Sequence, residues 1–157
     1  MLFAGDDIVA VHALAGGASL LLSKLIEIKS PNESWDRAAQ NSVKIDSATY
    51  FAILRKTQNF LKHADSDPDG VHEFYIEDTA SMMMSAVMNL VNLQKLTMFQ
   101  EVYQLWFLAC ILDVFPRDFA LRPGLIETFG DLSRRTMTYR IAVGRRVLAK
   151  AVAAHDF

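Results

Sequence analysis

Apolar positions recur at steps of three and four residues through most of this 157-residue chain, which is the spacing of one face of an α-helix. The first long segment of this kind covers about residues 6–29, with acidic caps at its start. Gly16 and Gly17 cost helix stability there, so we expect another helix to approach closely. The face of this helix that we expect in the core is formed by Val11, Ala15, Ala18, Leu22 and Leu25.

The same spacing predicts further main helices, separated by turn-forming residues. One begins at Asp46 or Ser47 and continues to about Ala64, followed by an acidic loop over residues 65–78. Short helices are expected after Ser34 and at Pro123. The other main helices are expected over about residues 79–96, 97–115 and 132–155, the first of them capped by Asp78 or Thr79.

These elements predict an all-α fold, because no convincing strand pattern appears. We expect one domain over residues 1–157, a single bundle of about five main helices. Its short connections favour antiparallel neighbours. The segment 97–115 is apolar on nearly all sides beyond Val102, so we expect it to be the central buried helix.

Composition points to a globular protein with apolar surface to spare. The chain is 52% hydrophobic and 22% charged, with a net charge of −2 and a mean hydropathy of +0.16. The near-neutral charge gives no general reason to bind nucleic acid or anionic lipid. The slightly apolar balance favours a well-filled core and an apolar surface for a partner.

The start of the chain and its apolar runs indicate where in the cell we expect the protein, and its single cysteine indicates whether a thiol is available for chemistry. Asp6 and Asp7 stand where a signal peptide carries positive charge. The apolar runs near residues 8–22 and 105–115 are interrupted or shorter than the roughly 20 residues of a spanning helix. Cys110 lies in an apolar run, which favours a buried small hydrophobe over a nucleophile. We therefore expect a cytoplasmic protein without a membrane partner.

A polar stripe marks the helix that begins at Asp46. Its members fall on one helical face, and a histidine beside cationic and amide side chains is able to act on a phosphodiester without a metal. The alternative is a solvated face with a histidine near the helix C-terminus, where positive charge is favoured. His12 has two interpretations, a hydrogen-bonded core histidine or a group that meets this stripe across a helix–helix groove. The stripe consists of Arg55, Asn59, Lys62 and His63.

An aspartate-rich segment follows the stripe and carries the one cofactor prediction, a divalent cation. Asp65, Asp67 and Asp69, followed by glycine, match the first half of an EF-hand loop. The second half fails, because Ile76 stands where the loop requires a bidentate glutamate. The alternative is a turn whose aspartates cap backbone amides.

Positive charge gathers on the last helix. Six cations and no acid lie between Leu132 and His155, so the rest of the chain sums to −8. This asymmetry suits a nucleic-acid or membrane face, or a helix that packs on the acidic segment 65–78 of the same or another subunit. The negative net charge of the chain favours packing of this helix on the acidic segment. The six cations are Arg134, Arg135, Arg140, Arg145, Arg146 and Lys150.

The run Asn59-Phe-Leu-Lys-His-Ala-Asp-x-Asp-Pro-Asp69 resembles a family of uncharacterised small bacterial all-helical proteins. The resemblance extends over about residues 5–116 and implies a helical fold but no activity. A looser similarity is to HEPN-type helical domains, often RNases with an Arg-x(4–6)-His motif. Here seven residues separate Arg55 from His63, and Lys56, at a spacing of six, is not an arginine.

Three functions follow from these features. The leading hypothesis is a non-catalytic helical protein that acts through a homo-oligomer or another protein partner, because its surfaces are predicted to be apolar and charge-segregated and one helix is rich in methionine. The alternative is a HEPN-like RNA-binding or RNA-cleaving protein that uses the polar stripe and His12. The third is a divalent-cation site at Asp65, Asp67 and Asp69.

Overall fold

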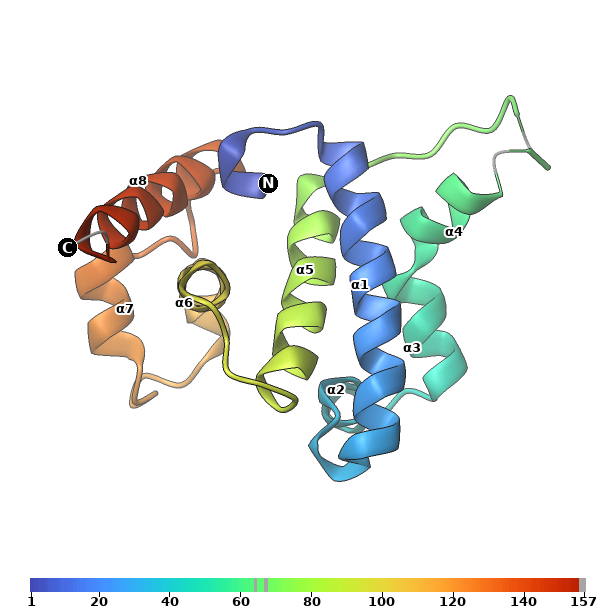
Figure 1. Cartoon of the computed structure of the whole chain (residues 1–157), viewed down its shortest axis with the longest axis horizontal. Coiled ribbons are helices and arrows are strands. Elements are labelled where there is room, and N and C mark those ends of the chain that lie inside the picture. The colour runs from blue at the N-terminus through green and yellow to red at the C-terminus, as the bar shows by residue number, and fades with distance from the viewer. Residues whose placement is uncertain (64, 67, 156–157) are drawn as a thin grey trace. The chain divides into compact units, whose positions relative to one another are not determined.

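The computed structural model of the protein describes residues 1–63, 65–66 and 68–155, and every regular element in these ranges is a helix (Figure 1). This confirms the all-α prediction. The described residues form eight α-helices rather than about five, with three short 3-10 helices. The α-helices are α1 (Ile8–Lys29), α2 (Trp35–Val43), α3 (Ser47–Leu54), α4 (Lys56–Lys62), α5 (Ile76–Val91), α6 (Met98–Cys110), α7 (Arg122–Phe129) and α8 (Met137–His155). The 3-10 helices are η1 (Leu2–Ala4), η2 (Pro31–Glu33) and η3 (Leu112–Val114).

The helices divide between two compact units. The α1–α5 unit comprises Asp6–Lys95, and the α6–α8 unit comprises the chain from Leu96 onward together with Met1–Gly5. The prediction of a single bundle of about five helices is therefore not confirmed.

The starts of α1, α2, α3 and α6 follow capping residues in the sequence. A helix leaves its first N–H groups without backbone partners, and a side-chain oxygen just before it supplies one. Thr97 and Gln100 form a complete capping box at the start of α6. Single side-chain caps are made by Asp7 to the Ala10 N–H (2.9 Å), Ser34 to the Arg37 N–H (3.3 Å) and Asp46 to the Thr49 N–H (3.0 Å).

Several boundaries differ from the prediction. The last helix begins at Met137 rather than about Leu132, and the helix expected over residues 97–115 ends at Cys110. The helix expected to run from Asp46 to Ala64 is broken at Arg55, whose backbone leaves the helical region (φ −104°, ψ 13°) and whose guanidinium lies 4.1 Å above the Phe51 ring. The break lets α4 turn Thr57 and Gln58 into the core. The predicted loop also ends early, because α5 begins at Ile76.

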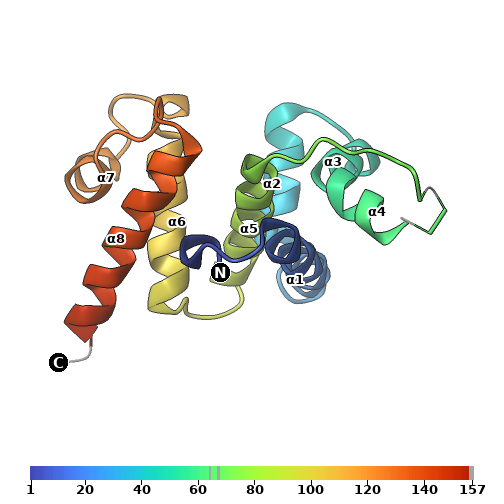
Figure 2. The same cartoon turned by 90° about the horizontal axis from the view of Figure 1, so that it is seen from above.

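In the α1–α5 unit, α1 packs mainly along α5 (Figure 1, Figure 2). Met82 and Met84 of α5 are buried, so these methionines fill the core rather than forming a contact surface. A Cβ at Gly16 would overlap the Gln58 side chain, so the expected close approach at the paired glycines occurs there. At Gly17 the space is open.

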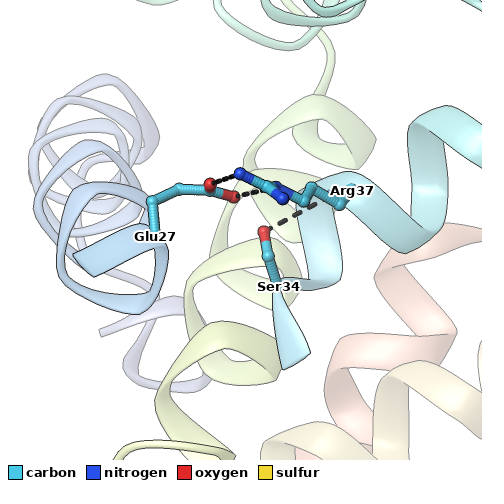
Figure 3. A network of polar contacts seen from close by, with 3 residues as sticks. All are labelled: Glu27, Ser34 and Arg37. Atoms are coloured by element: carbon cyan, nitrogen blue, oxygen red, sulfur yellow. Dashed lines mark hydrogen bonds and ion pairs between the residues drawn. The ribbon is translucent and has the colours of Figure 1, made fainter. Parts of the chain in front are cut away.

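An ion pair joins the C-terminal end of α1 to α2. The Arg37 guanidinium binds both carboxylate oxygens of Glu27, and Ser34 accepts from the Arg37 N–H beside it (Figure 3). Both charged side chains are partly exposed, so the pair contributes a few tenths of a kcal/mol to about 1 kcal/mol.

The α6–α8 unit is built around Trp106, which is fully buried. Its indole Nε1 donates to the Arg140 carbonyl of α8 (2.7 Å), and the Phe3 ring of η1 meets it edge-on at 5.0 Å. A Cβ at Gly144 would strike Phe3 and Trp106, so the glycine permits this contact. The first residues of the chain are therefore part of the core of its last third.

Candidate functional site

The polar stripe predicted for RNA chemistry lies on the exposed side of α4. Asn59, Lys62 and His63 are exposed, whereas Arg55 is half-buried beneath its contact with Phe51. Burial lowers the pKa of Arg55, and the charge of the nearby Asp36 acts in the opposite direction. Arg55 therefore packs on Phe51, whereas the other three residues of the stripe face solvent.

His12 lies elsewhere, buried against α5. Its Nδ1 is 3.1 Å from the Thr79 hydroxyl, and the Phe74 ring meets it edge-on at 5.4 Å. Burial lowers the pKa of His12; the charge of Asp78 raises that pKa and His72 lowers it further. This confirms the interpretation as a hydrogen-bonded core histidine. The structure does not bring His12 to the exposed stripe on α4.

The aspartate-rich segment is only partly described. Asp65 and Asp69 are exposed, and Asp67 lies outside the described residues. Within residues 1–63, 65–66 and 68–155, no group of three or more His, Cys, Asp or Glu side chains is placed to hold a metal. The divalent-cation site stays a prediction.

Two arginines of the predicted basic helix donate hydrogen bonds to backbone carbonyls of their own unit. The Arg140 guanidinium donates to the carbonyls of Leu132 (2.9 Å) and Ser133 (2.6 Å), and Arg145 donates to the carbonyl of Phe3. The four other cations predicted on this helix, Arg134, Arg135, Arg146 and Lys150, are exposed.

Cys110 is buried at the end of α6, as expected. Burial raises the pKa of its thiol to about 12. The thiol therefore stays protonated at neutral pH and is a poor nucleophile.

The sequence interpretation missed the most connected polar group of the α1–α5 unit, Asp36 of α2, which is only 2% exposed. Its Oδ2 accepts from the Ser23 hydroxyl (2.6 Å) and the Asn89 amide (2.9 Å). Its Oδ1 accepts from the hydroxyls of Tyr50 (3.0 Å) and Ser85 (3.2 Å). Four donors on α1, α3 and α5 occupy the carboxylate, so it joins helices rather than meeting a substrate. No motif marks it in the sequence.

The exposed face of α1 carries large apolar side chains. Leu14 and Leu21 are each 59% exposed and Ile28 is 79% exposed. The opposite, buried face includes polar side chains, His12, Ser19 and Ser23. We call the exposed row the α1 stripe, defined as Ala10, Leu14, Gly17, Leu21, Lys24 and Ile28.

The core face expected for α1 was therefore partly wrong. Val11 and Ala15 are buried as predicted, but Ala18 is exposed and Leu22 and Leu25 are half-buried. The buried face is rotated toward the polar residues because their partners lie on α5 and α2: His12 meets Thr79, and Ser23 donates to Asp36.

α1 also meets the length and composition test for a membrane span, the one described helix to do so. The core helix of a soluble protein can pass the same test, and 33% of the apolar window of α1 is buried inside the protein. Comparison with family models, with curated proteins and with solved structures finds no match to this chain.

Proposed function

We propose that this chain is a non-catalytic helical protein that acts by self-association, with the α1 stripe as its contact surface. The observation that carries the proposal is the exposed apolar row on α1, where Leu14, Leu21 and Ile28 face solvent. Contiguous exposed apolar surface on a soluble protein marks a binding surface more often than a free one.

The size of the stripe sets the expected strength of the contact. Burying a Leu or Ile side chain completely contributes about 1.5–3 kcal/mol. From Ala10 to Ile28 the stripe is about 27 Å long at the helical rise, so one helix pair makes an interface at the small end of the known range. We therefore expect a dimer with a micromolar dissociation constant.

The positions of the reactive side chains support a non-catalytic role. The polar residues of α4 are exposed, whereas His12 is buried against α5, and Cys110 is a buried thiol in the other unit. Asp36 is occupied by four hydrogen-bond donors.

Sedimentation of the whole chain between about 1 and 100 µM tests the proposal. We expect a monomer–dimer equilibrium in wild type and a monomer in Leu21→Gln. Val43→Gln is the matched control, because Val43 is also 59% exposed and lies on another helix of the same unit, and it should dimerise like wild type. A wild-type monomer at the highest concentration would refute the proposal.

RNA binding or cleavage on α4 is the second candidate, favoured by the exposure of Asn59, Lys62 and His63 on one helix. It predicts salt-sensitive RNA binding or cleavage that is lost in His63→Ala and kept in Lys95→Ala, which removes an exposed cation away from α4. Intact, unbound RNA at low salt would exclude it.

A further inference from the structure

We propose that two copies of the chain pair through α1 in antiparallel orientation, with Gly17 of each copy opposite Leu21 of the other. This inference rests on the proposed function and adds the partner, the orientation and the register. The partner is a second copy because the stripe complements itself in both size and charge.

The spacing of the stripe suits a helix pair. Its six members are separated by steps of four, three, four, three and four residues, the repeat of a coiled-coil seam. All six are exposed, and on a helical projection they lie opposite the buried face of α1. A second helix can therefore lie along the stripe without disturbing the packing on α5.

Side-chain size favours the antiparallel arrangement. Two of the six members of the stripe, Ala10 and Gly17, are small. Antiparallel pairing at the proposed register sets Ala10 opposite Ile28 of the second copy and Gly17 opposite Leu21, so each small residue meets a large one. The remaining pair is Leu14 opposite Lys24, whose aliphatic stem packs on the leucine. Gly17 has open space beside it, since a Cβ there would meet nothing within 4 Å. Parallel pairing would set leucine on leucine and glycine on glycine, leaving gaps between crowded layers.

Charge favours the same arrangement. The start of α1 carries Asp6 and Asp7 with no base before Lys24, and its end carries Lys24 and Lys29. At the proposed register Lys29 lies within about one turn of the acidic pair of the second copy. The antiparallel helix dipoles also attract. Parallel pairing would place the Lys24 side chains of the two copies beside each other.

The one acid near these lysines on α1 is already engaged. Glu27 binds Arg37 of α2 in the bidentate pair that Figure 3 shows. It therefore does not offset the positive charge of Lys24 and Lys29.

Cysteine cross-linking in the full chain tests the orientation. In a Cys110→Ser background, Ala10→Cys and Ile28→Cys are made singly, tagged differently, mixed and oxidised or treated with a short bis-maleimide. We expect a cross-link between the two different variants. Neither variant alone should cross-link, because antiparallel pairing sets identical positions about 27 Å apart, far beyond disulfide reach.

Each other result overturns the inference in a distinguishable way. Cross-links within each single variant would show a parallel pair, so self-association through α1 would stand and the orientation would fall. A dimer in sedimentation without any of these cross-links would show another interface. A monomer would remove both the inference and the proposed function.

A size swap tests the register. Gly17→Leu alone sets leucine on leucine, and Leu21→Gly alone sets glycine on glycine, so each should raise the dimer Kd about tenfold or more. The double variant restores a large residue opposite a small one and keeps the composition of the helix. It should return the Kd to near the wild-type value, and a double variant as weak as the singles would refute the register. Circular dichroism of each variant checks that α1 still folds.

Discussion

Asp36 is the residue on which the packing of the α1–α5 unit depends most. Asp36→Ala would leave the donors of Ser23, Tyr50, Ser85 and Asn89 buried without their acceptor. Hydrogen bonds to a charged group contribute more than neutral ones, and stranded buried donors cost extra, so we expect a loss of about 3–5 kcal/mol in the free energy of unfolding. Urea denaturation measures it.

Two further variants distinguish the loss of the Asp36 hydrogen bonds from the general effect on stability of removing an acidic side chain. Asp36→Asn keeps the shape but exchanges one accepting oxygen for a donor, so it should lose less, about 1–2 kcal/mol. Glu33→Ala removes an exposed acid of the same unit and should change stability by less than about 0.5 kcal/mol. Equal losses in Asp36→Ala and Glu33→Ala would contradict the role of the network.

His12 predicts a specific pH dependence. Burial lowers its pKa below the ordinary 6.5, so the unfolded chain binds a proton more readily than the folded one. Stability contributed by neutral His12 is complete above about pH 7 and falls as the pH drops through the unfolded-state pKa of about 6.5. The free energy of unfolding should therefore decrease between pH 7.5 and 5.

His12→Gln isolates this contribution, because His63, His72 and His155 stay in both proteins. The decrease between pH 7.5 and 5 should be smaller in the variant than in wild type. Glu27, Asp46 and Asp131 have lowered pKa values and lose their stabilising effect in more acidic solutions, outside this window. Identical slopes in the two proteins would contradict the prediction.

The sequence predicted single residues well where local context decides their state. A buried position was one of the two interpretations of His12, and Cys110 was expected to be buried because it lies in an apolar run. Asp36 was missed because a polar residue near a helix start is ordinarily exposed. Its burial depends on hydroxyls and an amide brought from three other helices, and nothing in its neighbourhood along the chain reveals them.

At the scale of elements, the adjacent glycines of α1 form a matched pair. Gly16→Ala would drive a Cβ into Gln58, so we expect a loss of about 1–3 kcal/mol. Gly17→Ala meets open space and removes the helix penalty of glycine, so we expect a gain of about 0.5–1 kcal/mol. Denaturation in a Leu21→Gln background excludes contributions from self-association. A gain in both variants would refute the close contact at Gly16.

Helix starts were predictable where a side chain caps the first turn, because capping is local chemistry, as Asp7, Ser34 and Asp46 illustrate. The cap expected at Asp78 or Thr79 was wrong, because α5 already begins at Ile76 without a side-chain cap. The break at Arg55 was not predictable, because no proline or glycine marks it and the apolar spacing continues across it. The break follows from tertiary packing, in which Thr57 and Gln58 turn into the core. The exposed face of α1 was also misjudged, since spacing alone cannot show which side of an apolar helix meets its neighbours.

At the scale of the whole molecule, the first five residues belong to the unit formed by the last third of the chain. Phe3 contacts Tyr103 and Trp106 and fits against Gly144. Phe3→Ala should destabilise the α6–α8 unit by about 3–5 kcal/mol, the usual cost of removing a buried phenylalanine ring. Hydrogen exchange read peptide by peptide measures the free energy of opening in each helix separately.

The two units should respond differently to this change. In Phe3→Ala, amides of α6 and α8 should exchange faster, while those of α5 should keep their wild-type rates because Phe3 packs in the other unit. Val114→Ala shortens a 76% exposed side chain of the α6–α8 unit. It should leave the exchange rates unchanged in both units. Equal acceleration in α5 and α6 would mean that the chain unfolds as one cooperative structure, which would support the single domain expected from sequence and contradict independent stability of the two units.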